Sequence, residues 1–179
     1  MKKLLSAAAL GISIASLLGV SPSFQARAQT ADNVLRGVSK IRLSIDSLGE
    51  DSASCGLTRD LIRDAVRHAT GAVRFQMITD PDKEKGPRPD ALLYVKVNTL
   101  FFKTLDLCVS NVSVQAYATQ ALTLTSSHRA ISAEVGLWDE GSGMGSSSRA
   151  EHADYVSQMI DKNANKFIND WNLDNRDEK

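Results

Sequence analysis

The feature that most constrains the fold is an uninterrupted run of strand-forming residues at 91–102. The run is rich in β-branched and aromatic residues, has no glycine or proline, and is about twice as long as an average strand. Val95 and Val97 alternate with Lys96 and Asn98, so one face is apolar and the other is more polar. The run therefore predicts the central strand of a sheet with one dry face, which helices must cover.

Periodic segments on both sides of this run supply the rest of the domain. Alternating residues predict strands at 40–46, 73–77, 108–124 and 131–138, and apolar residues spaced by three and four predict helices at 58–70 and 149–171. The first strand, helix and strand imply a parallel crossover, whereas the later strands, joined by short links, imply an antiparallel meander. The expected fold class is α+β, with two layers, a mixed five-stranded sheet in the order β-α-β-β-β-β-α, and two helices packed on one face. We expect six residues in its core: Val95, Val97, Val112, Val114, Phe167 and Trp171.

Three segments are predicted to be connections. Residues 47–56 and 80–90 are polar and contain glycine, and 141–148 consists almost entirely of glycine and serine. The last segment precedes a helix, as phosphate-binding loops do. It lacks the Lys-Ser/Thr ending of such loops, and no later strand completes a βαβ unit. We therefore predict a flexible connection and no cofactor.

The first 28 residues have the pattern of an export signal. Lys2 and Lys3 precede an apolar run at 4–20, and a small-x-small site ends at Ala28. A single-pass anchor is the competing interpretation, but the cleavage site favours removal, and no cysteine follows the run to accept a lipid. We expect a periplasmic or secreted protein cleaved after Ala28, with a loose leader at 29–37, one α+β domain at 38–172, and a flexible charged tail at 173–179.

Charge and hydropathy exclude several kinds of partner. The whole chain has 21 basic and 21 acidic residues, so removal of Lys2, Lys3 and Arg27 leaves a net charge of −3. Nucleic-acid-binding proteins usually carry a basic patch, so we expect no nucleic-acid partner. The predicted mature chain contains no apolar run long enough to span a membrane. Another envelope protein is the expected partner, and the oligomeric state stays open.

Cys55 and Cys108 are the only cysteines. An even pair in an exported protein predicts one structural disulfide. The alternatives are a redox pair, in which the cysteines are usually two residues apart, and a zinc site, for which two thiolates are too few.

No motif in the chain indicates catalysis or metal binding. The three histidines are His68, His128 and His152, and none forms a ligand pair of recognised spacing. His152 has Asp139, Glu140 and Glu151 nearby in sequence, which leaves a carboxylate-rich cation site as an alternative. A Ser/His/Asp triad assembled in space also stays open, although no nucleophile-elbow pattern is present. We expect a protein that is not an enzyme and has no catalytic, cofactor or metal-binding residues.

Two groups of residues are candidates for binding an anion or a partner. Arg59, Arg63 and Arg67 form a ridge along one helix, although interleaved aspartates favour a self-neutralised, solvated face. Phe101 and Phe102 are adjacent, so a continuing strand places one of them on each face of the sheet.

Three short segments carry a resemblance to a known family. The segments Gly56-Leu-Thr-Arg-Asp, Leu93-Tyr-Val-Lys-Val-Asn-Thr and Lys166-Phe-Ile-Asn-Asp170 resemble a family of small exported bacterial proteins of unknown function, over residues 37–172. More distantly, the layout is similar to the α+β modules of the curli-secretion lipoproteins and of the N-terminal domain of the Tol translocation protein. These resemblances imply protein binding in the envelope and no catalysis. The chain lacks the lipidated cysteine of the curli-type proteins, so they do not imply membrane anchoring.

Three functional hypotheses follow from the sequence, each with its own structural signature. A protein-binding adaptor that uses an exposed sheet face or an edge strand should have a filled core and an uncovered patch of large apolar residues. A binder of a small amphiphilic or anionic ligand should have a deep cavity between helix and sheet. A hydrolase should have a buried serine or aspartate beside a histidine.

Overall fold

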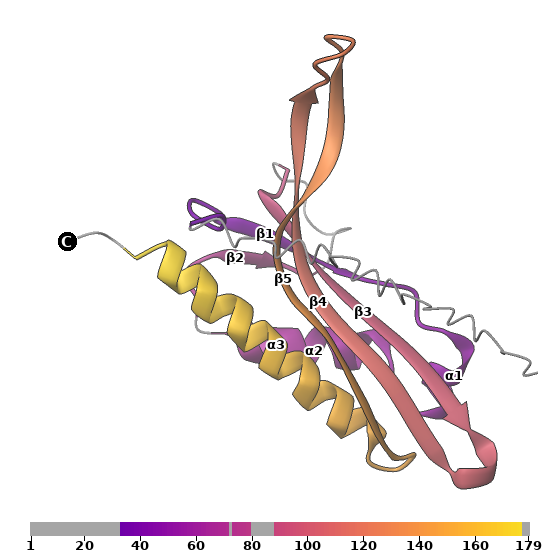
Figure 1. The fold of residues 1–179 in the computed structure, drawn as a ribbon. Helices are drawn as coiled ribbons and strands as arrows, with labels where there is room; N and C mark the ends of the chain where they lie inside the picture. Colours follow the sequence, from indigo (N-terminus) through magenta and orange to yellow (C-terminus); the bar gives the residue numbers. More distant parts are fainter. Residues whose placement is uncertain (1–32, 72, 80–87, 177–179) are drawn as a thin grey trace, which may run out of the picture.

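The computed structural model describes residues 33–71, 73–79 and 88–176. It has two layers, a mixed five-stranded sheet and helices against one face of it (Figure 1), so the predicted fold class is confirmed. The strands are β1 (Lys40–Ile45), β2 (Gln76–Ile78), β3 (Ala91–Phe102), β4 (Leu107–Thr123) and β5 (Ala130–Ser148). The helices are α1 (Glu50–Ser54), α2 (Arg59–Thr70) and α3 (His152–Asp174), and a 3₁₀ turn, Lys103–Leu105, joins β3 to β4. The predicted signal peptide and residues 80–87 of the predicted polar connection lie outside the described residues.

The strand order is β2-β1-β3-β4-β5, so β3 occupies the centre of the sheet as predicted. β1 pairs in parallel with both β2 and β3, whereas β3–β4 and β4–β5 are antiparallel. The predicted crossover and the predicted meander are therefore both confirmed.

The core lies between the sheet and the pair α2 and α3. Alternate residues of β3 from Ala91 to Thr99 and of β4 from Cys108 to Ala118 are buried, and Val95 lies opposite Val114 across the two strands. α2 contributes Ile62 and Val66, and α3 contributes a long buried stripe that includes Phe167. All six predicted core residues are buried, which confirms that part of the prediction.

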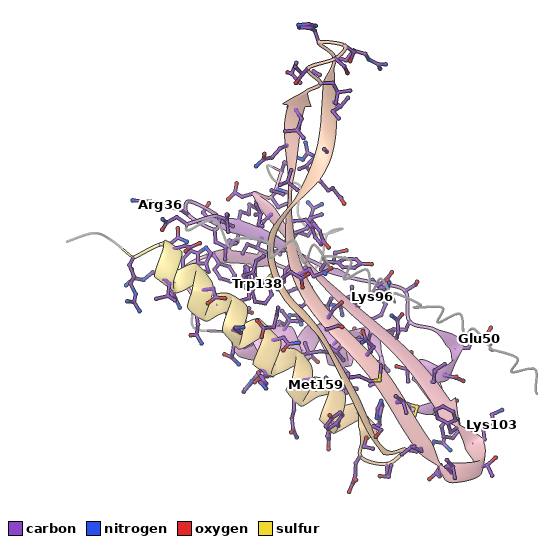
Figure 2. All side chains as sticks on the ribbon, in the orientation of Figure 1. Arg36, Glu50, Lys96, Lys103, Trp138 and Met159 are labelled. Carbon is purple, nitrogen blue, oxygen red and sulfur yellow. A yellow bond between two sulfur atoms is a disulfide. The ribbon has the colours of Figure 1, made fainter. Side chains whose placement is uncertain are left out.

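The other face of the sheet is covered by none of the described helices, and we call it the open face. Lys96 on β3 is exposed on this face, whereas Trp138 on β5 points to the opposite side and donates a hydrogen bond to Asp170 of α3 at 2.7 Å (Figure 2). The alternation that buries one set of side chains therefore leaves the other set in solvent.

The predicted Gly/Ser connection at 141–148 is wrong, because these residues form the second half of β5. Gly143 and Gly145 lie on the face that packs against α3. A Cβ atom on Gly143 would lie 2.8 Å from Cε of Met159, and one on Gly145 would overlap the ring of Tyr155. The glycines therefore serve close packing of a helix on a strand, a use that composition alone does not distinguish from a flexible loop.

The domain also extends beyond its predicted boundaries. Leu35, in the predicted loose leader, is buried, and its backbone N–H donates to Asp174 at 2.9 Å. Asn175 accepts a hydrogen bond from the N–H of Gly37 at 2.8 Å and donates one to the carbonyl of Leu35 at 2.9 Å. Residues 33–37 and 173–175 are therefore tied to each other and to the domain. A further difference is α1, which forms within the predicted loop at 47–56.

The end of β4 and the start of β5 leave the sheet as a projecting two-stranded hairpin (orange in Figure 1), which we call the hairpin arm, residues 118–135. Pairing of β3 with β4 ends at Leu92 and Tyr117, so the arm has no third strand. Within the arm, Ala118 lies opposite Val135 and Leu122 lies opposite Ile131. Two register shifts between β4 and β5 lie at the base of the arm, where bulges increase the local twist of a ribbon.

Replacing Gly145 with alanine should destabilise the protein by about 1–3 kcal/mol, because the added methyl group overlaps Tyr155 in an already packed interface. Gly136→Ala is the matched control, since no atom lies within 4 Å of its added Cβ. Urea unfolding of both variants measures the effect. Equal unfolding free energies for the two variants would show that α3 does not pack closely on β5.

Candidate functional site

A group of large apolar side chains lies together on the open face, near the turn between β3 and β4. We call it the open-face patch and define it as Leu100, Phe102, Leu107, Val109 and Met144. Leu100 lies opposite Val109, and Phe102 lies opposite Leu107. Met144 is on β5, two residues from the position opposite Val109. The exposed fractions of Leu100, Phe102 and Met144 are 60%, 46% and 73%.

The patch arises because the open face of β3 changes character along its length. Lys96 and Asn98 occupy this face first, and Leu100 and Phe102 then follow at the same alternation. Single exposed apolar residues are common on protein surfaces, but a contiguous set bordered by polar groups marks an interaction site. Sequence analysis identified Phe102 but missed Leu100, although the same alternation places both on one face.

The two predicted phenylalanines lie on opposite faces and have different environments. Phe101 points to the helix side, where its ring lies under the guanidinium of Arg149 at 5.5 Å. Its backbone N–H donates to Asp51 at 3.1 Å. Phe101 therefore holds the end of β3 against α1, and Phe102 is the one of the two that is available to a partner.

The arginine ridge on α2 makes contacts with its own surroundings. Arg59 donates to the carbonyl of Ile45 at 2.7 Å, and Arg63 forms an ion pair with Asp60. Arg67 donates to the hydroxyl of Thr79 at 2.8 Å and to Asp64 at 3.4 Å. These contacts give each guanidinium an acceptor within the domain, so the ridge is not an array of free cations awaiting an anion.

An open groove of about 700 Å³ lies between α2 and α3. The seven residues that line it are Leu61, Asp64, Ala65, His68, Ser157, Gln158 and Asp161. His68 and Asp161 close one side through a contact of 2.8 Å. All of these residues come from the two helices and none from the sheet, so the groove is not the cavity between helix and sheet expected for a ligand binder. Its two carboxylates also disfavour an anion.

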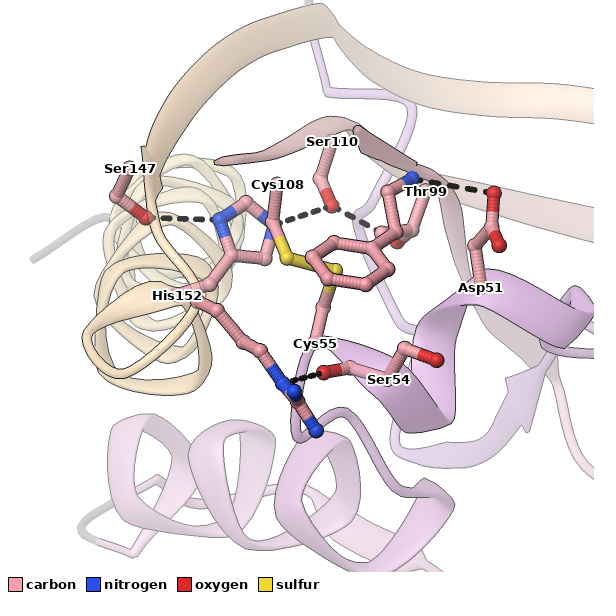
Figure 3. The surroundings of a disulfide bond; sticks show 10 residues. Asp51, Ser54, Cys55, Thr99, Cys108, Ser110, Ser147 and His152 are labelled. Atoms are coloured by element: carbon pink, nitrogen blue, oxygen red, sulfur yellow. Dashed lines mark hydrogen bonds between the residues drawn. A yellow bond between two sulfur atoms is a disulfide. The ribbon is translucent and has the colours of Figure 1, made fainter. Parts of the chain in front are cut away.

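A buried polar cluster surrounds His152 at the start of α3 (Figure 3). The imidazole is fully buried, and its Nε2 lies 2.7 Å from Oγ of Ser110. Its Nδ1 lies 2.8 Å from Oγ of Ser147, and Ser110 is in turn hydrogen-bonded to Thr99 at 2.8 Å. Sequence analysis missed this cluster, because its members come from three strands and a helix that meet only in the fold.

The His152 cluster has the serine–histidine contact expected of a hydrolase but lacks other parts of such a site. Both imidazole nitrogens are bonded to hydroxyl groups, so no carboxylate orients the ring. Ser110 and His152 are both fully buried, so neither group is exposed to solvent. Burial lowers the pKa of the His152 imidazole below its ordinary value of 6.5 and favours the neutral ring. The cluster therefore acts as an anchor between α3, β4 and β5.

The carboxylates near His152 in sequence are directed elsewhere. Asp139 accepts a hydrogen bond from the side-chain amide of Gln115 at 3.0 Å. Glu140 pairs with Lys166, and Glu151 accepts a bond from Ser148 at 3.1 Å. Within the described residues, no group of three His, Cys, Asp or Glu side chains is arranged to hold a metal ion.

The predicted disulfide between Cys55 and Cys108 is present (Figure 3). Both residues are fully buried, with Cα atoms 6.0 Å apart. Cys55 caps the C-terminal end of α1, and Cys108 lies at the start of β4. The bond therefore ties α1 to the sheet beside the His152 cluster.

No family model and no curated protein matches this chain. The resemblance to exported envelope proteins therefore stays an expectation. Among the described helices, none combines the length and the apolar composition needed to cross a bilayer.

The buried imidazole predicts a loss of stability in acid. Because the pKa of His152 is lowered in the folded state, its contribution to stability is complete above the unfolded value of 6.5 and is lost as the pH falls below it. Unfolding free energy, measured from about pH 7 to about pH 5, should fall more steeply in the wild type than in His152→Gln. Leu122→Gln, an exposed substitution that changes no titratable group, is the control and should keep the wild-type slope. Parallel slopes for the wild type and His152→Gln would contradict this account.

The disulfide closes a loop with a sequence separation of 53 residues. The Cys55→Ser, Cys108→Ser double variant should lose about 2–4 kcal/mol of unfolding free energy, since the open chain regains loop entropy. Chemical denaturation with and without a reductant measures this. The reduced wild type should match the variant, and an oxidised wild type no more stable than the variant would refute the structural role.

Proposed function

We propose that this protein is an exported, non-enzymatic adaptor of the bacterial cell envelope that binds another protein through the open-face patch. The observation that carries the proposal is the exposure of Leu100, Phe102 and Met144 on a sheet whose opposite face is filled and covered. Removing a large apolar side chain from water contributes about 1.5–3 kcal/mol, so three such residues supply a useful part of a binding energy.

The surroundings of the patch support a protein partner. Lys103 and Asp106 flank the turn at its end, and Leu105 between them is 70% exposed. A rigid apolar centre with a border of both charge signs matches the usual anatomy of a protein–protein interface. The predicted net charge of −3 and the engagement of the α2 arginines by neighbouring oxygen atoms support a protein rather than a nucleic acid or an anionic lipid surface.

Location in the periplasm is part of the proposal. The buried disulfide fits an oxidising compartment outside the cytoplasm. The N-terminal signal pattern at 1–28 supports export by cleavage after Ala28.

Binding of a small amphiphilic or anionic ligand between helix and sheet is the alternative function, and the described side chains support it less. The apolar residues between the layers pack against one another in a single core. Arg59, Arg63 and Arg67 are engaged by neighbouring oxygen atoms, and the open groove carries Asp64 and Asp161. The seclusion of Ser110 and His152 likewise supports a protein that is not an enzyme.

The proposal predicts that two substitutions in the patch, Leu100→Asp and Phe102→Asp, weaken partner binding. The purified protein is first used to capture a stoichiometric partner from envelope extract, and native mass spectrometry identifies it. The dissociation constant of the reconstituted complex should then rise at least roughly tenfold for each variant, since each loses a contact of hot-spot size.

Leu122→Asp provides the control, because Leu122 is also exposed but lies on the hairpin arm. It should bind like the wild type. Equal affinity of the patch variants and the wild type would refute the proposal, as would retention of a small molecule with no protein partner.

A further inference from the structure

The two edges of the sheet differ strongly. β2 forms one edge and has three residues, whereas β5 forms the other and has 19. Within the described ranges no strand lies beyond β5. An edge strand presents a row of backbone N–H and C=O groups, and proteins usually protect it with lysine, proline or a very short length. β5 is long and contains neither lysine nor proline.

The most regular part of this edge is Ser142–Ser148. Its pairing with β4 is continuous from Ser113–Ser142 to Leu107–Ser148, and both register shifts lie outside it. The segment has no charged residue and consists of serine and glycine with a single larger residue, Met144. It is therefore a regularly paired, neutral edge that presents no like charges to an identical strand.

We propose that two copies of this chain join edge to edge through Ser142–Ser148, antiparallel about a two-fold axis, and form a continuous ten-stranded sheet. Antiparallel pairing about such an axis keeps the helix faces of both copies on one side. It pairs the outward-facing backbone N–H and C=O groups of Ser142–Ser148 in both copies at once, which is the arrangement of an isologous dimer.

The position of α3 favours a second copy over a foreign peptide strand. α3 contacts β5 where Tyr155 and Met159 cover Gly145 and Gly143, and it contacts β4 where His152 meets Ser110. Neighbouring strands lie about 4.8 Å apart. The axis of a helix centred over β4 and β5 therefore projects onto the sheet midway between them, about 2.4 Å from β5 on the side of β4. A two-fold axis half a spacing outside β5 then places the two α3 helices about 10 Å apart, the separation of packed helices.

A foreign strand added to the same edge would satisfy the backbone groups but would bring no helix to lie beside α3. In the dimer the two α3 helices run antiparallel, and their Tyr155 and Met159 side chains, which are half-buried in one copy, lie near the junction. A second copy therefore offers a strand to pair with β5 and a helix to pack beside α3, whereas a peptide offers only the strand.

This inference is independent of the proposed function. Leu100 and Phe102 lie on β3, two strands inside the edge, so edge pairing leaves this part of the open-face patch exposed in each copy. Met144 lies on the paired segment itself, with its side chain on the open face beside the junction. An adaptor with two patches would hold a partner by both sites.

Sedimentation equilibrium of the purified, oxidised protein tests the dimer. Ser146 is exposed on the open face near the centre of the paired segment, so Ser146→Lys brings two like charges together across the axis. The wild type should sediment as a dimer, and both Ser146→Lys and Ser146→Glu should raise the dimer dissociation constant at least roughly tenfold. An equimolar mixture of the two variants should restore dimers, because the opposite charges then attract.

Leu100→Lys is the control and should remain dimeric, while circular dichroism should show that all variants are folded. A wild type that stays monomeric at the highest attainable concentration would overturn the inference, as would dimers that Ser146→Lys leaves unchanged. A wild type that is monomeric and still binds the partner through Leu100 and Phe102 would overturn the dimer and leave the proposed function standing on its own.

Discussion

The structure depends on one constraint, that the sheet is sealed on a single face. α2 and α3 bury alternate residues of β1, β3 and β4, so the remaining side chains of those strands must point the other way. A strand that fixes Val95 and Val97 in the core thereby fixes Leu100 and Phe102 on the open side. The exposed patch is therefore a direct consequence of the same register that builds the core, and a one-residue slip of β3 would lose both.

Close packing of α3 on the sheet keeps the core side of the sheet covered. Gly143 and Gly145 allow Met159 and Tyr155 to lie directly on β5, and His152 fixes the first turn of the helix through two serine hydroxyls. At the other end of α3, Trp171 donates to the carbonyl of Val38 at 2.8 Å, and Asp174 holds the backbone of Leu35. These contacts hold both ends and the first half of α3, which explains how a single long helix stays packed over β4 and β5.

Much of the fold could be predicted from the sequence, because strands that bury one face alternate visibly and helices that cover them repeat every three to four residues. The Gly/Ser half of β5 could not, since its glycines are explained only by Tyr155 and Met159, which the chain reaches ten and more residues later. The His152 cluster has no local signal either. Part of the candidate surface could be predicted through Phe102, but its neighbours Val109 and Met144 depend on the pairing register between strands.

The central claim is that the sheet has one sealed and one solvent-facing side, and hydroxyl-radical footprinting read by mass spectrometry tests it most directly. At a concentration low enough to keep the protein unassociated, Leu100, Phe102 and Met144 should be oxidised rapidly. In the same experiment, buried side chains of comparable intrinsic reactivity, such as Leu93 and Phe167, should be protected. Protection of Phe102 and Met144 equal to that of Leu93 and Phe167 would contradict the account, because it would mean that the open face is covered in the isolated protein.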